Sequence, residues 1–447
     1  MIFKRKIYDK ILSWKKNYAG KYALLIEGAR RIGKSTIVEE FAKNEYEDYL
    51  MLDFANIDSE IVALFDRMSD INRFFFELQA LTGKSLSAHK SVIIFDEVQF
   101  CPKARQAIKY LVKDGRYDYI ETGSLISIRK NVQNILIPSE EMRISMYPMD
   151  FEEFLWAIGK APTYDFIRYS YEQLAPLGDS VNRAVLRDFR LYMLVGGMPQ
   201  ALNAYIDTND FMNVDFTKRE ILELYYADFR KIDPIGRIST IFSHIPAELS
   251  RSAMRYKVGS VIEGARPSRM GELFADMSDS KTVNFAFHAN DPCIGLALHA
   301  DFNYFKLFMG DTGLFITAIF NDSNFVDKDI YKKLLSDKLP IDLGYVFENI
   351  VAQQLTSAGH SLYYYTFKET QEYYDTPRQY EIDFLISRNN KICPIEVKSS
   401  GYKVHKSLDL FQRKFSSRIN QSYILYTKDI RKEGDIVCLP IYMAGLL

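Results

Sequence analysis

A run of eight residues near the N-terminus has the spacing of a loop that binds nucleotide phosphates. Residues 28–35 fit the pattern GxxxxGK[ST], with Gly28, Gly33, Lys34 and Ser35 at its defining positions. The glycines let the backbone curl so that amide N–H groups face phosphate oxygens, the lysine neutralises the β- and γ-phosphates, and the serine hydroxyl binds Mg²⁺. We therefore expect ATP and Mg²⁺ at this loop, with nucleotide contacts from Gly28, Ala29, Arg30, Arg31, Ile32, Gly33, Lys34, Ser35 and Thr36.

Two carboxylates follow a later apolar run and complete the same chemistry. Asp96 and Glu97 end the predicted strand 91–95, at the carboxyl edge of a parallel sheet. Asp96 and Ser35 are the expected Mg²⁺ ligands, and Glu97 is the expected catalytic residue that polarises the attacking water. A hydroxyl at the end of the next strand, Thr122 or Ser124, either senses the γ-phosphate or is an ordinary turn residue.

Three arginines near this motif have open roles. Arg143 is either a charge-stabilising finger for a neighbouring subunit or a surface residue, so an oligomer stays a possibility. Arg30 and Arg31 are more simply explained as solvated or packed side chains than as catalytic groups.

A second group of chemistry-bearing residues lies near the C-terminus. Residues 380–386 and 392–398 alternate apolar and polar side chains around a short turn, so a hairpin places Asp383, Glu396 and Lys398 on one face of a sheet. Glu348, in a predicted helix, can pack across that face. We expect Asp383 and Glu396 to hold a hard cation, and all four residues to act in metal-dependent phosphodiester cleavage. The alternative is a salt-bridged polar face in which Lys398 pairs with one of the two carboxylates.

The elements that position these residues alternate between strand and helix over the first 150 residues, which indicates an α/β parallel sheet. Apolar spacing then predicts helices from residue 150 to 232, and two or three short helices from 235 to 310 with strand-like runs at 294–300 and 305–309. The predicted strands of the first part are 22–26, 49–54, 91–96 and 117–122, with helices at 34–42, 61–82 and 102–113. In the last part we predict a helix at 347–355 and strands at 361–367, 380–387, 392–398 and 422–427.

Composition limits the class of protein. The 447 residues are 47% hydrophobic and 26% charged, which is typical of a globular chain and excludes whole-chain disorder. A net charge of −1 argues against a uniformly basic nucleic-acid binder. A local basic stretch nevertheless makes DNA a candidate partner, with a solvated helix face as the alternative; it holds Arg251, Arg255, Lys257, Arg266 and Arg269 against Glu263.

The cysteines and the N-terminus predict a cytoplasmic, soluble chain. Cys101, Cys293, Cys393 and Cys438 form no CxxC pair, and histidine is too sparse around them for a zinc knuckle. We therefore interpret them as reduced core thiols. The basic N-terminus has no apolar core of a signal peptide, and no stretch reaches the ~18 apolar residues of a membrane span, so we expect no membrane partner.

The motifs together resemble a known family over nearly the whole chain. The first part resembles archaeal-type AAA ATPases through Arg5-Lys6-Ile7-Tyr8, residues 28–35, Asp96-Glu97-Val98-Gln99 and Thr122-Gly123-Ser124. The later part resembles that family's usual C-terminal partner, a domain of unknown function related to PD-(D/E)xK nucleases. This second resemblance rests on Phe305-Lys306-Leu307, Asp311-Thr312-Gly313-Leu314, Phe347-Glu348-Asn349, Glu381-Ile382-Asp383-Phe384 and Pro394-Ile395-Glu396-Val397-Lys398.

The resemblance implies an α/β fold in four parts. These are a P-loop ATPase core at 1–150, a helical lid at 151–234, a winged-helix-like module at 235–315 and a restriction-endonuclease-like domain at 316–447. The function expected from it is an ATP-regulated, DNA-acting AAA-type ATPase with a Mg²⁺-dependent nuclease-like domain. The alternative is an ATP-driven switch or scaffold whose nuclease-like domain is inactive and serves binding. A toxic or sensor component of a defence or plasmid-maintenance system would fit either mechanism.

Overall fold

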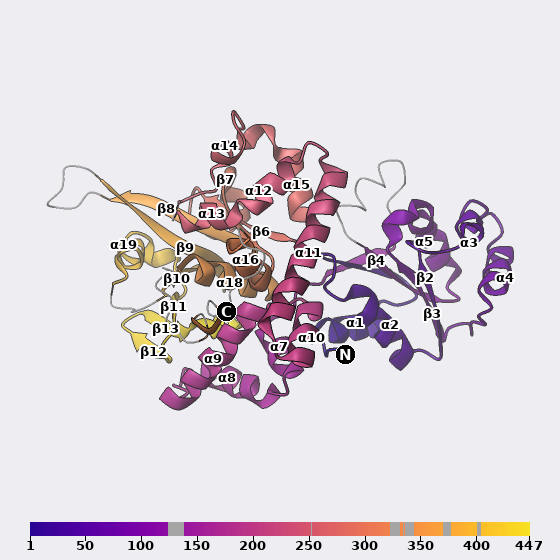
Figure 1. Cartoon of the computed structure of the whole chain (residues 1–447), viewed down its shortest axis with the longest axis horizontal. Helices are drawn as coiled ribbons and strands as arrows, with labels where there is room; N and C mark the ends of the chain where they lie inside the picture. Colours follow the sequence, from indigo (N-terminus) through magenta and orange to yellow (C-terminus); the bar gives the residue numbers. More distant parts are fainter. Residues whose placement is uncertain are drawn as a thin grey trace. The chain divides into compact units, whose positions relative to one another are not determined.

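The computed structural model describes residues 1–123, 138–251, 253–321, 331–333, 335, 344–369, 377–399 and 404–447. The chain divides into two compact units (Figure 1). Unit 1 comprises Met1–Tyr147 with Asp279–Lys281, and unit 2 comprises Pro148–Ser278 with Thr282–Leu447. No helix in the described part of the chain is long and apolar enough to cross a membrane.

Unit 1 is built on a five-stranded, all-parallel sheet with the strand order β2-β3-β4-β1-β5. The α/β class and the four strands predicted from the sequence are confirmed. The fifth strand was not predicted, because its edge position and its polar residues give no buried apolar run. The strands are β1 (Ala23–Glu27), β2 (Asp48–Asp53), β3 (Ser91–Asp96), β4 (Asp118–Gly123) and β5 (Glu141–Ser145).

The helices of unit 1 follow the predicted alternation with one correction. The single helix predicted over residues 61–82 is two helices, because Asp70 begins the second one by accepting a hydrogen bond from the Arg73 amide at 3.1 Å. The helices are α1 (Ile7–Asn17), α2 (Lys34–Glu45), α3 (Ser59–Leu64), α4 (Ile71–Thr82), the 3₁₀ turn η1 (Val98–Phe100) and α5 (Pro102–Asp114).

Unit 2 begins with the helices expected between residues 150 and 232. Two glycines after α9 make a tight contact, since a Cβ at Gly197 would lie 2.2 Å from the Met149 carbonyl oxygen. The helices are α7 (Phe151–Ala157), α8 (Ala161–Gln173), α9 (Asp179–Val195), α10 (Pro199–Thr208) and α11 (Phe211–Ile232). Shorter ones follow: α12 (Arg237–Ser243), α13 (Ile245–Ser250), α14 (Val258–Val261), η2 (Pro267–Arg269), α15 (Gly271–Asp279) and α16 (Thr312–Ile319).

The second half of unit 2 is a mixed eight-stranded sheet with the order β12-β13-β11-β10-β9-β8-β6-β7. Its strands are β6 (Val283–Ala289), β7 (Ala300–Met309), β8 (Leu362–Glu369), β9 (Arg378–Arg388), β10 (Lys391–Val397), β11 (Ser422–Tyr426), β12 (Arg431–Glu433) and β13 (Ile436–Pro440). Its remaining helices are α18 (Gly344–Ser357), α19 (Lys406–Phe415), η3 (Leu296–His299), η4 (Ser416–Arg418) and η5 (Ile441–Leu446).

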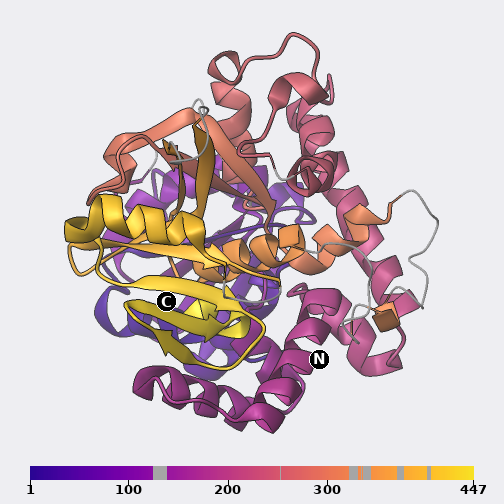
Figure 2. The same ribbon diagram turned by 90° about the vertical axis from the view of Figure 1, so that its left-hand side faces the viewer.

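The two faces of this sheet are different. Ile382 and other apolar side chains form a core with Leu408 and Phe411 of α19, which lies along one face in Figure 2. Asp383 follows Ile382 in an extended strand and so points to the opposite face. Helix α18 supplies Glu348 close to Asp383 and therefore covers this second face.

Strands β6 and β7 differ from the expectation of a separate winged-helix-like module at 235–315. Strand β6 pairs in parallel with β8, with Ala286 opposite Leu362, so both strands belong to the C-terminal sheet. The sheet therefore crosses the expected boundary at 315/316. Residues 296–299, expected within a strand, form the 3₁₀ turn η3 after Gly295, whose φ is +78°.

The interpretation of all four cysteines as core thiols was wrong for one of them. Cys101, Cys393 and Cys438 are buried, and all four thiols are free. Cys293 is only half-buried and lies in the connection between β6 and β7. The apolar sequence around it resembles a strand, but the chain turns there.

Candidate functional sites

The GxxxxGK[ST] loop lies between β1 and α2, where the pattern requires it. Gly33 has φ +93° and ends the loop at the start of α2. A Cβ on Gly28 would lie 2.4 Å from the Met146 carbonyl oxygen, so only glycine fits at that position. The backbone thus turns sharply at the N-terminus of a twelve-residue helix, where amide N–H groups and the helix dipole favour an anion.

Lys34 is buried against its own loop. Its Nζ donates to the carbonyl oxygens of Gly28 at 3.1 Å and Ala29 at 2.9 Å. Burial lowers the pKa of the Lys34 ammonium, and the nearby charges of Glu97 and Asp96 oppose that shift. The predicted lysine therefore lies within electrostatic reach of both predicted carboxylates.

The predicted magnesium residues are in direct contact. Ser35 Oγ donates to Asp96 Oδ1 at 2.7 Å, and the Thr122 hydroxyl donates to the same oxygen. The Glu97 amide donates to Thr122 Oγ1 at 3.2 Å, and the Glu97 carboxylate accepts from the side chain of Gln99. Thr122 is thus placed beside the acidic pair, whereas Ser124 lies outside the described residues.

The remaining loop residues are divided between the interior and the surface. Ala29 and Ile32 are buried, Arg30 is half-buried, and Arg31 and Thr36 are exposed. Arg143, a candidate finger, donates to Glu141 at 2.7 Å on the edge strand β5.

Arg5 contacts the phosphate-binding loop, although sequence reasoning gave it no role. Its side chain is buried and donates to the Ile32 carbonyl at 2.8 Å and the Tyr147 carbonyl at 2.7 Å. It therefore ties the phosphate-binding loop to the segment that follows β5. The sequence indicated Arg5 only through the Arg5-Lys6-Ile7-Tyr8 motif. Its partners are backbone carbonyl groups, which every residue type has, so they cannot be recognised from the sequence.

The second predicted site is assembled on the α18 face of the large sheet. Ile395 pairs with Phe384, so the next pair in the register is Glu396 with Asp383. The Val397 amide donates to Asp383 Oδ2 at 2.7 Å, and Lys398 Nζ lies 2.5 Å from Glu396 Oε1. The hairpin prediction is confirmed in its geometry, and the Lys398–Glu396 ion pair that we held as an alternative is also present.

Lys306 joins this site from β7 and was not predicted. It is 5% exposed, lies 3.3 Å from Glu348 Oε2 and donates to Glu381 Oε1. Its register partner on β6 is Ala286, whose small side chain leaves room for a long one to extend across the sheet. We call Glu348, Glu381, Asp383 and Glu396 the acidic cluster, with Lys306 and Lys398 as its two lysines.

Burial and like charge dominate the electrostatics of the acidic cluster. Burial, followed by the charge of Glu348, raises the pKa of Asp383 far above its usual range, and burial also raises the pKa of Glu381 and Glu396. Burial alone would lower the pKa of Lys306, but Glu348, Glu381 and Asp383 together raise it. Glu396 Oε2 is buried with no hydrogen-bond partner among the described residues. Four carboxylates thus face two ammonium groups in a largely buried cluster.

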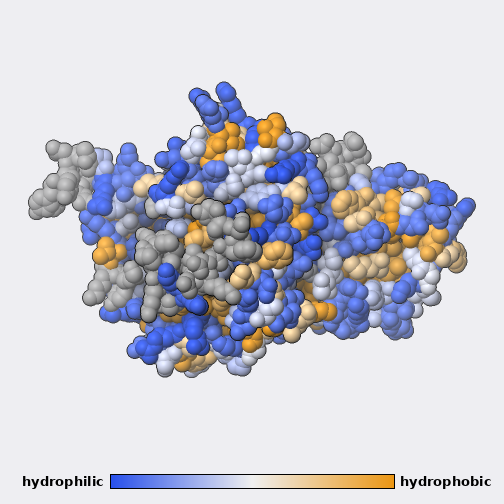
Figure 3. All heavy atoms as spheres, in the orientation of Figure 1, coloured by the Kyte–Doolittle hydropathy of each residue, from blue (hydrophilic) through white to orange (hydrophobic). Residues whose placement is uncertain are grey.

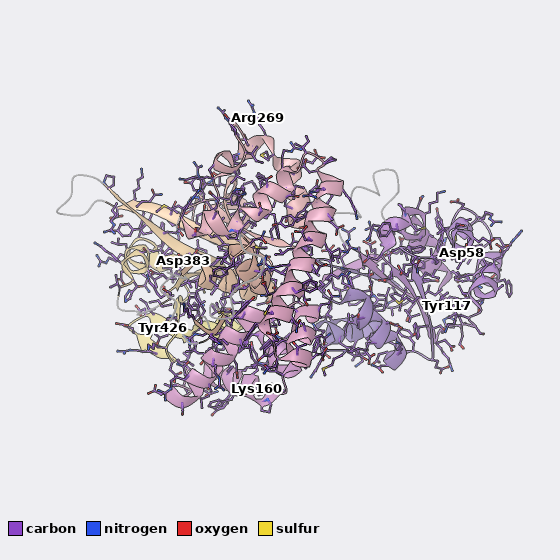
Figure 4. All side chains as sticks on the ribbon, viewed as in Figure 1. Asp58, Tyr117, Lys160, Arg269, Asp383 and Tyr426 are labelled. Carbon is purple, nitrogen blue, oxygen red and sulfur yellow. The ribbon has the colours of Figure 1, made fainter. Side chains whose placement is uncertain are left out.

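A basic surface lies in the same unit. Arg251, Arg255, Lys257, Arg266 and Arg269 are all exposed. Hydrophilic side chains project at the top of Figure 3, where Figure 4 labels Arg269. Arg255 stacks over the ring of Tyr304 at 4.5 Å and acts electrostatically on Tyr364, whose ring is 5.7 Å from Lys306 Nζ. The basic surface is therefore close to the acidic cluster.

Comparison with family models identifies the first site. Residues 20–155 match the model described as an AAA domain, and this segment contains the loop, Asp96, Glu97 and Thr122. Residues 20–155 form an AAA-type P-loop ATPase domain. Two domains of unknown function match further along, DUF8612 at 186–324 and DUF4143 at 343–443. The acidic cluster takes Lys306 from the first of these segments and its carboxylates from the second.

Solved structures resemble the chain only distantly. The Walker-type ATPase PABY2304 of Pyrococcus abyssi is 14% identical with a TM-score of 0.41, covering 71% of this chain and 96% of the other. AMPPCP-bound DnaA from Aquifex aeolicus is 10% identical with a TM-score of 0.29, covering 62% of this chain and 93% of the other. No curated protein sequence gives a significant match. The assignment of the AAA domain therefore rests on its family model and on the geometry of its loop.

Proposed function

We propose that the AAA domain binds ATP with Mg²⁺ and hydrolyses it. The observation that carries the proposal is the 2.7 Å contact between Ser35 Oγ and Asp96 Oδ1, which brings the loop hydroxyl and the strand-end carboxylate to one point. A hydroxyl and a carboxylate are the two oxygen ligands that P-loop enzymes use for Mg²⁺. The residues present therefore fit a Mg²⁺–ATP complex.

The roles of the residues follow from their positions. Amide groups of residues 28–36 hold the phosphates, and Ser35 with Asp96 holds the metal, which screens phosphate charge when bound. The Lys34 ammonium exchanges the two carbonyls of its own loop for phosphate oxygens, because charge-assisted hydrogen bonds are stronger than neutral ones. Glu97 orients the attacking water, and Thr122 holds Asp96 in place.

The test measures nucleotide binding and phosphate release separately. Lys34→Ala should lose binding of a fluorescent ATP analogue. Glu97→Gln should bind it normally and hydrolyse ATP about 10²–10⁴-fold more slowly, the usual contribution of a general base. Glu47 is an exposed glutamate paired with Lys90, and Glu47→Gln is the matched control. This variant should bind and hydrolyse ATP like the parent. Equal binding by the parent and Lys34→Ala would contradict the assignment.

A second candidate function for unit 2 is Mg²⁺-dependent cleavage of a phosphodiester backbone. The supporting observation is the acidic cluster itself, in which carboxylates with raised pKa values crowd one another and the buried Glu396 Oε2 has no partner among the described residues. A divalent cation would relieve that repulsion. Asp383, Glu396 and Glu348 would hold the metal, which activates water when bound, and Lys398 would orient that water.

DNA is the substrate that the surroundings of the acidic cluster favour. Five exposed cations lie on the basic surface, and one of them, Arg255, lies beside Tyr304 near the cluster. If the basic surface binds the phosphate groups of a DNA backbone, the bound DNA would extend towards the carboxylates of the acidic cluster. Binding should therefore weaken steeply as salt concentration rises, and binding that is insensitive to salt would argue against a phosphate-tracking role.

Cleavage of linear and supercoiled DNA and of RNA, with Mg²⁺ or Mn²⁺ and with or without ATP, tests this second function. Asp383→Ala and Lys398→Ala should abolish cleavage, while Lys391→Ala, an exposed lysine on the same hairpin, should retain it. Loss of cleavage in these two variants alone would establish a nuclease site at the acidic cluster, and a change in the parent's cleavage on adding ATP would show that the nuclease is ATP-regulated. If the parent cleaves none of these substrates, the nuclease proposal fails and the ATP-driven switch or scaffold becomes the better account of the protein.

A further inference from the structure

The connection between β6 and β7 brings three different metal-ligand side chains together. Asp291, Cys293 and His299 each offer one donor atom, and these three atoms lie within 4.8 Å of one another. All three side chains are half-buried and reachable from solvent. We propose that this loop binds a divalent transition-metal ion, with Zn²⁺ as the ion that suits it best.

The backbone of the loop already holds the donors in place. The Asn290 amide donates to the His299 carbonyl at 2.8 Å, which closes the loop at its base. The Cys293 amide donates to the Asp291 carbonyl at 2.9 Å, so these two ligands lie on one short turn. Gly295, with φ +78°, reverses the chain before η3 and returns His299 towards them. The arrangement is thus preorganised by main-chain hydrogen bonds.

The three ligand types favour a metal ion that is intermediate between hard and soft. A thiolate, an imidazole and a carboxylate are all ordinary ligands of Zn²⁺, whereas Mg²⁺ and Ca²⁺ take oxygen ligands. Zinc bonds of about 2.0–2.3 Å in a tetrahedron place ligand atoms roughly 3.3–3.7 Å apart. Donors within 4.8 Å of one another need to close by about 1 Å, which side-chain rotation can supply. Three protein ligands leave the fourth position to water.

Arg418 is the competing partner of this loop. Its Nη1 donates to Asp291 Oδ1, and its guanidinium lies 5.4 Å from the ring centre of Phe415. A carboxylate has two oxygens, so the ion pair and a metal bond can be made together. On metal binding the Cys293 thiol releases its proton to solvent as the sulfur–metal bond forms, and no oxidation or reduction takes place. The ion is then balanced by the charges of Asp291 and Cys293.

The proposal concerns a different part of unit 2 from the acidic cluster and is independent of both proposed activities. The sequence analysis considered only CxxC pairs and zinc knuckles and therefore did not group these three residues. The D-x-C-x₅-H spacing lacks the CxxC signature, and only the folding of the loop brings the histidine back to the thiol.

Cobalt binding tests the proposal on the full chain after treatment with a chelator. Co²⁺ titration should give thiolate-to-cobalt charge-transfer absorption in the near ultraviolet whose intensity corresponds to one thiolate-bound ion per chain, and Zn²⁺ should displace that cobalt. Cys293→Ser should abolish the charge-transfer band, while His299→Ala and Asp291→Asn should raise the Kd at least about tenfold. His244→Ala removes an exposed histidine outside the loop and should leave the titration unchanged.

Several outcomes would overturn the proposal. These are no charge-transfer band in the parent, a band that survives Cys293→Ser, or parent-like affinity in both His299→Ala and Asp291→Asn. Circular dichroism of each variant separates loss of a ligand from loss of folding. Cobalt bound only at the acidic cluster would give d–d absorption without a thiolate band, and would count against the loop.

Discussion

Replacing Arg5 should lower the free energy of unfolding of unit 1 and should also lower its affinity for ATP. The Arg5 side chain is 6% exposed and donates to the Ile32 carbonyl at 2.8 Å and to the Tyr147 carbonyl at 2.7 Å. A hydrogen bond from a charged donor contributes about 1.5–3 kcal/mol, so loss of these two bonds in Arg5→Ala should lower the free energy of unfolding of unit 1 by roughly 3–6 kcal/mol.

The effect on ATP affinity follows from the loop. Ile32 belongs to the phosphate-binding loop, and without Arg5 its peptide is free to reorient before nucleotide binds. Fixing one residue's backbone again costs about 1–2 kcal/mol, which corresponds to a roughly 5- to 30-fold rise in the Kd for ATP. ATP at a high concentration should restore part of the stability that Arg5→Ala loses, because ATP binds the folded state and not the unfolded chain.

The two tryptophans allow unit 1 to be followed alone. Trp14 is buried in α1 of unit 1 and donates to the Tyr22 carbonyl at 3.0 Å, whereas Trp156 lies in unit 2. In a Trp156→Phe background, urea unfolding monitored by fluorescence therefore reports on unit 1. Arg73→Ala, which breaks an exposed pair with Glu77, is the matched control and should cost no more than about 0.5 kcal/mol. If Arg5→Ala and Arg73→Ala gave the same midpoint and the same ATP affinity, the positioning role of Arg5 would be refuted.

Three further perturbations have outcomes set by the structure. Glu141→Gln should destabilise unit 1 by about 3–5 kcal/mol in the same fluorescence assay, because Arg105 makes bonds of 2.8 and 2.9 Å to it and both side chains are 1% exposed. Gly197→Ala would place a Cβ 2.2 Å from a carbonyl oxygen and should lower the melting temperature of unit 2, whereas Gly271→Ala, with no atom within 4 Å, should not. Carboxyl groups with raised pKa values bind protons in the folded state that the unfolded chain releases above about pH 4, so the acidic cluster should make unit 2 less stable as pH rises from there. Added Mg²⁺ should restore stability increasingly at higher pH, and a Mg²⁺ effect that is equal at acidic and alkaline pH would contradict this account of the cluster.

Features confined to one short stretch of chain could be predicted from the sequence. The loop at residues 28–35 lies between a strand and a helix because the motif itself spans that turn. Asp383 and Glu396 share a face because strict alternation fixes the direction of side chains on two strands joined by a short turn. The edge strand β5 was missed although its five residues alternate polar and apolar, because the run is short and none of its side chains is fully buried.

Contacts made across long sequence separations could not be predicted. Arg5 binds carbonyl groups, and any residue type at position 32 would supply the same acceptor. Cys293 was interpreted as a core thiol because the sequence shows no CxxC pair and few histidines, whereas its proximity to His299 depends on a turn at Gly295. Periodicity describes a helix or a strand well, but it contains no information on which distant strand becomes its neighbour.

The position of Lys306 shows why this limit matters for function. Lys306 and Glu381 are 75 residues apart, and their contact exists because β6 pairs with β8 and so brings β7 into the same sheet. A fragment starting at residue 316 would contain all four carboxylates of the acidic cluster but would lack Lys306 and would expose the edge of β8. Its carboxylates would repel one another without their buried counter-ion, and the open edge would favour aggregation. Inactivity of such a fragment would therefore say nothing about the chemistry of the cluster, and only the full chain can decide whether unit 2 cleaves DNA.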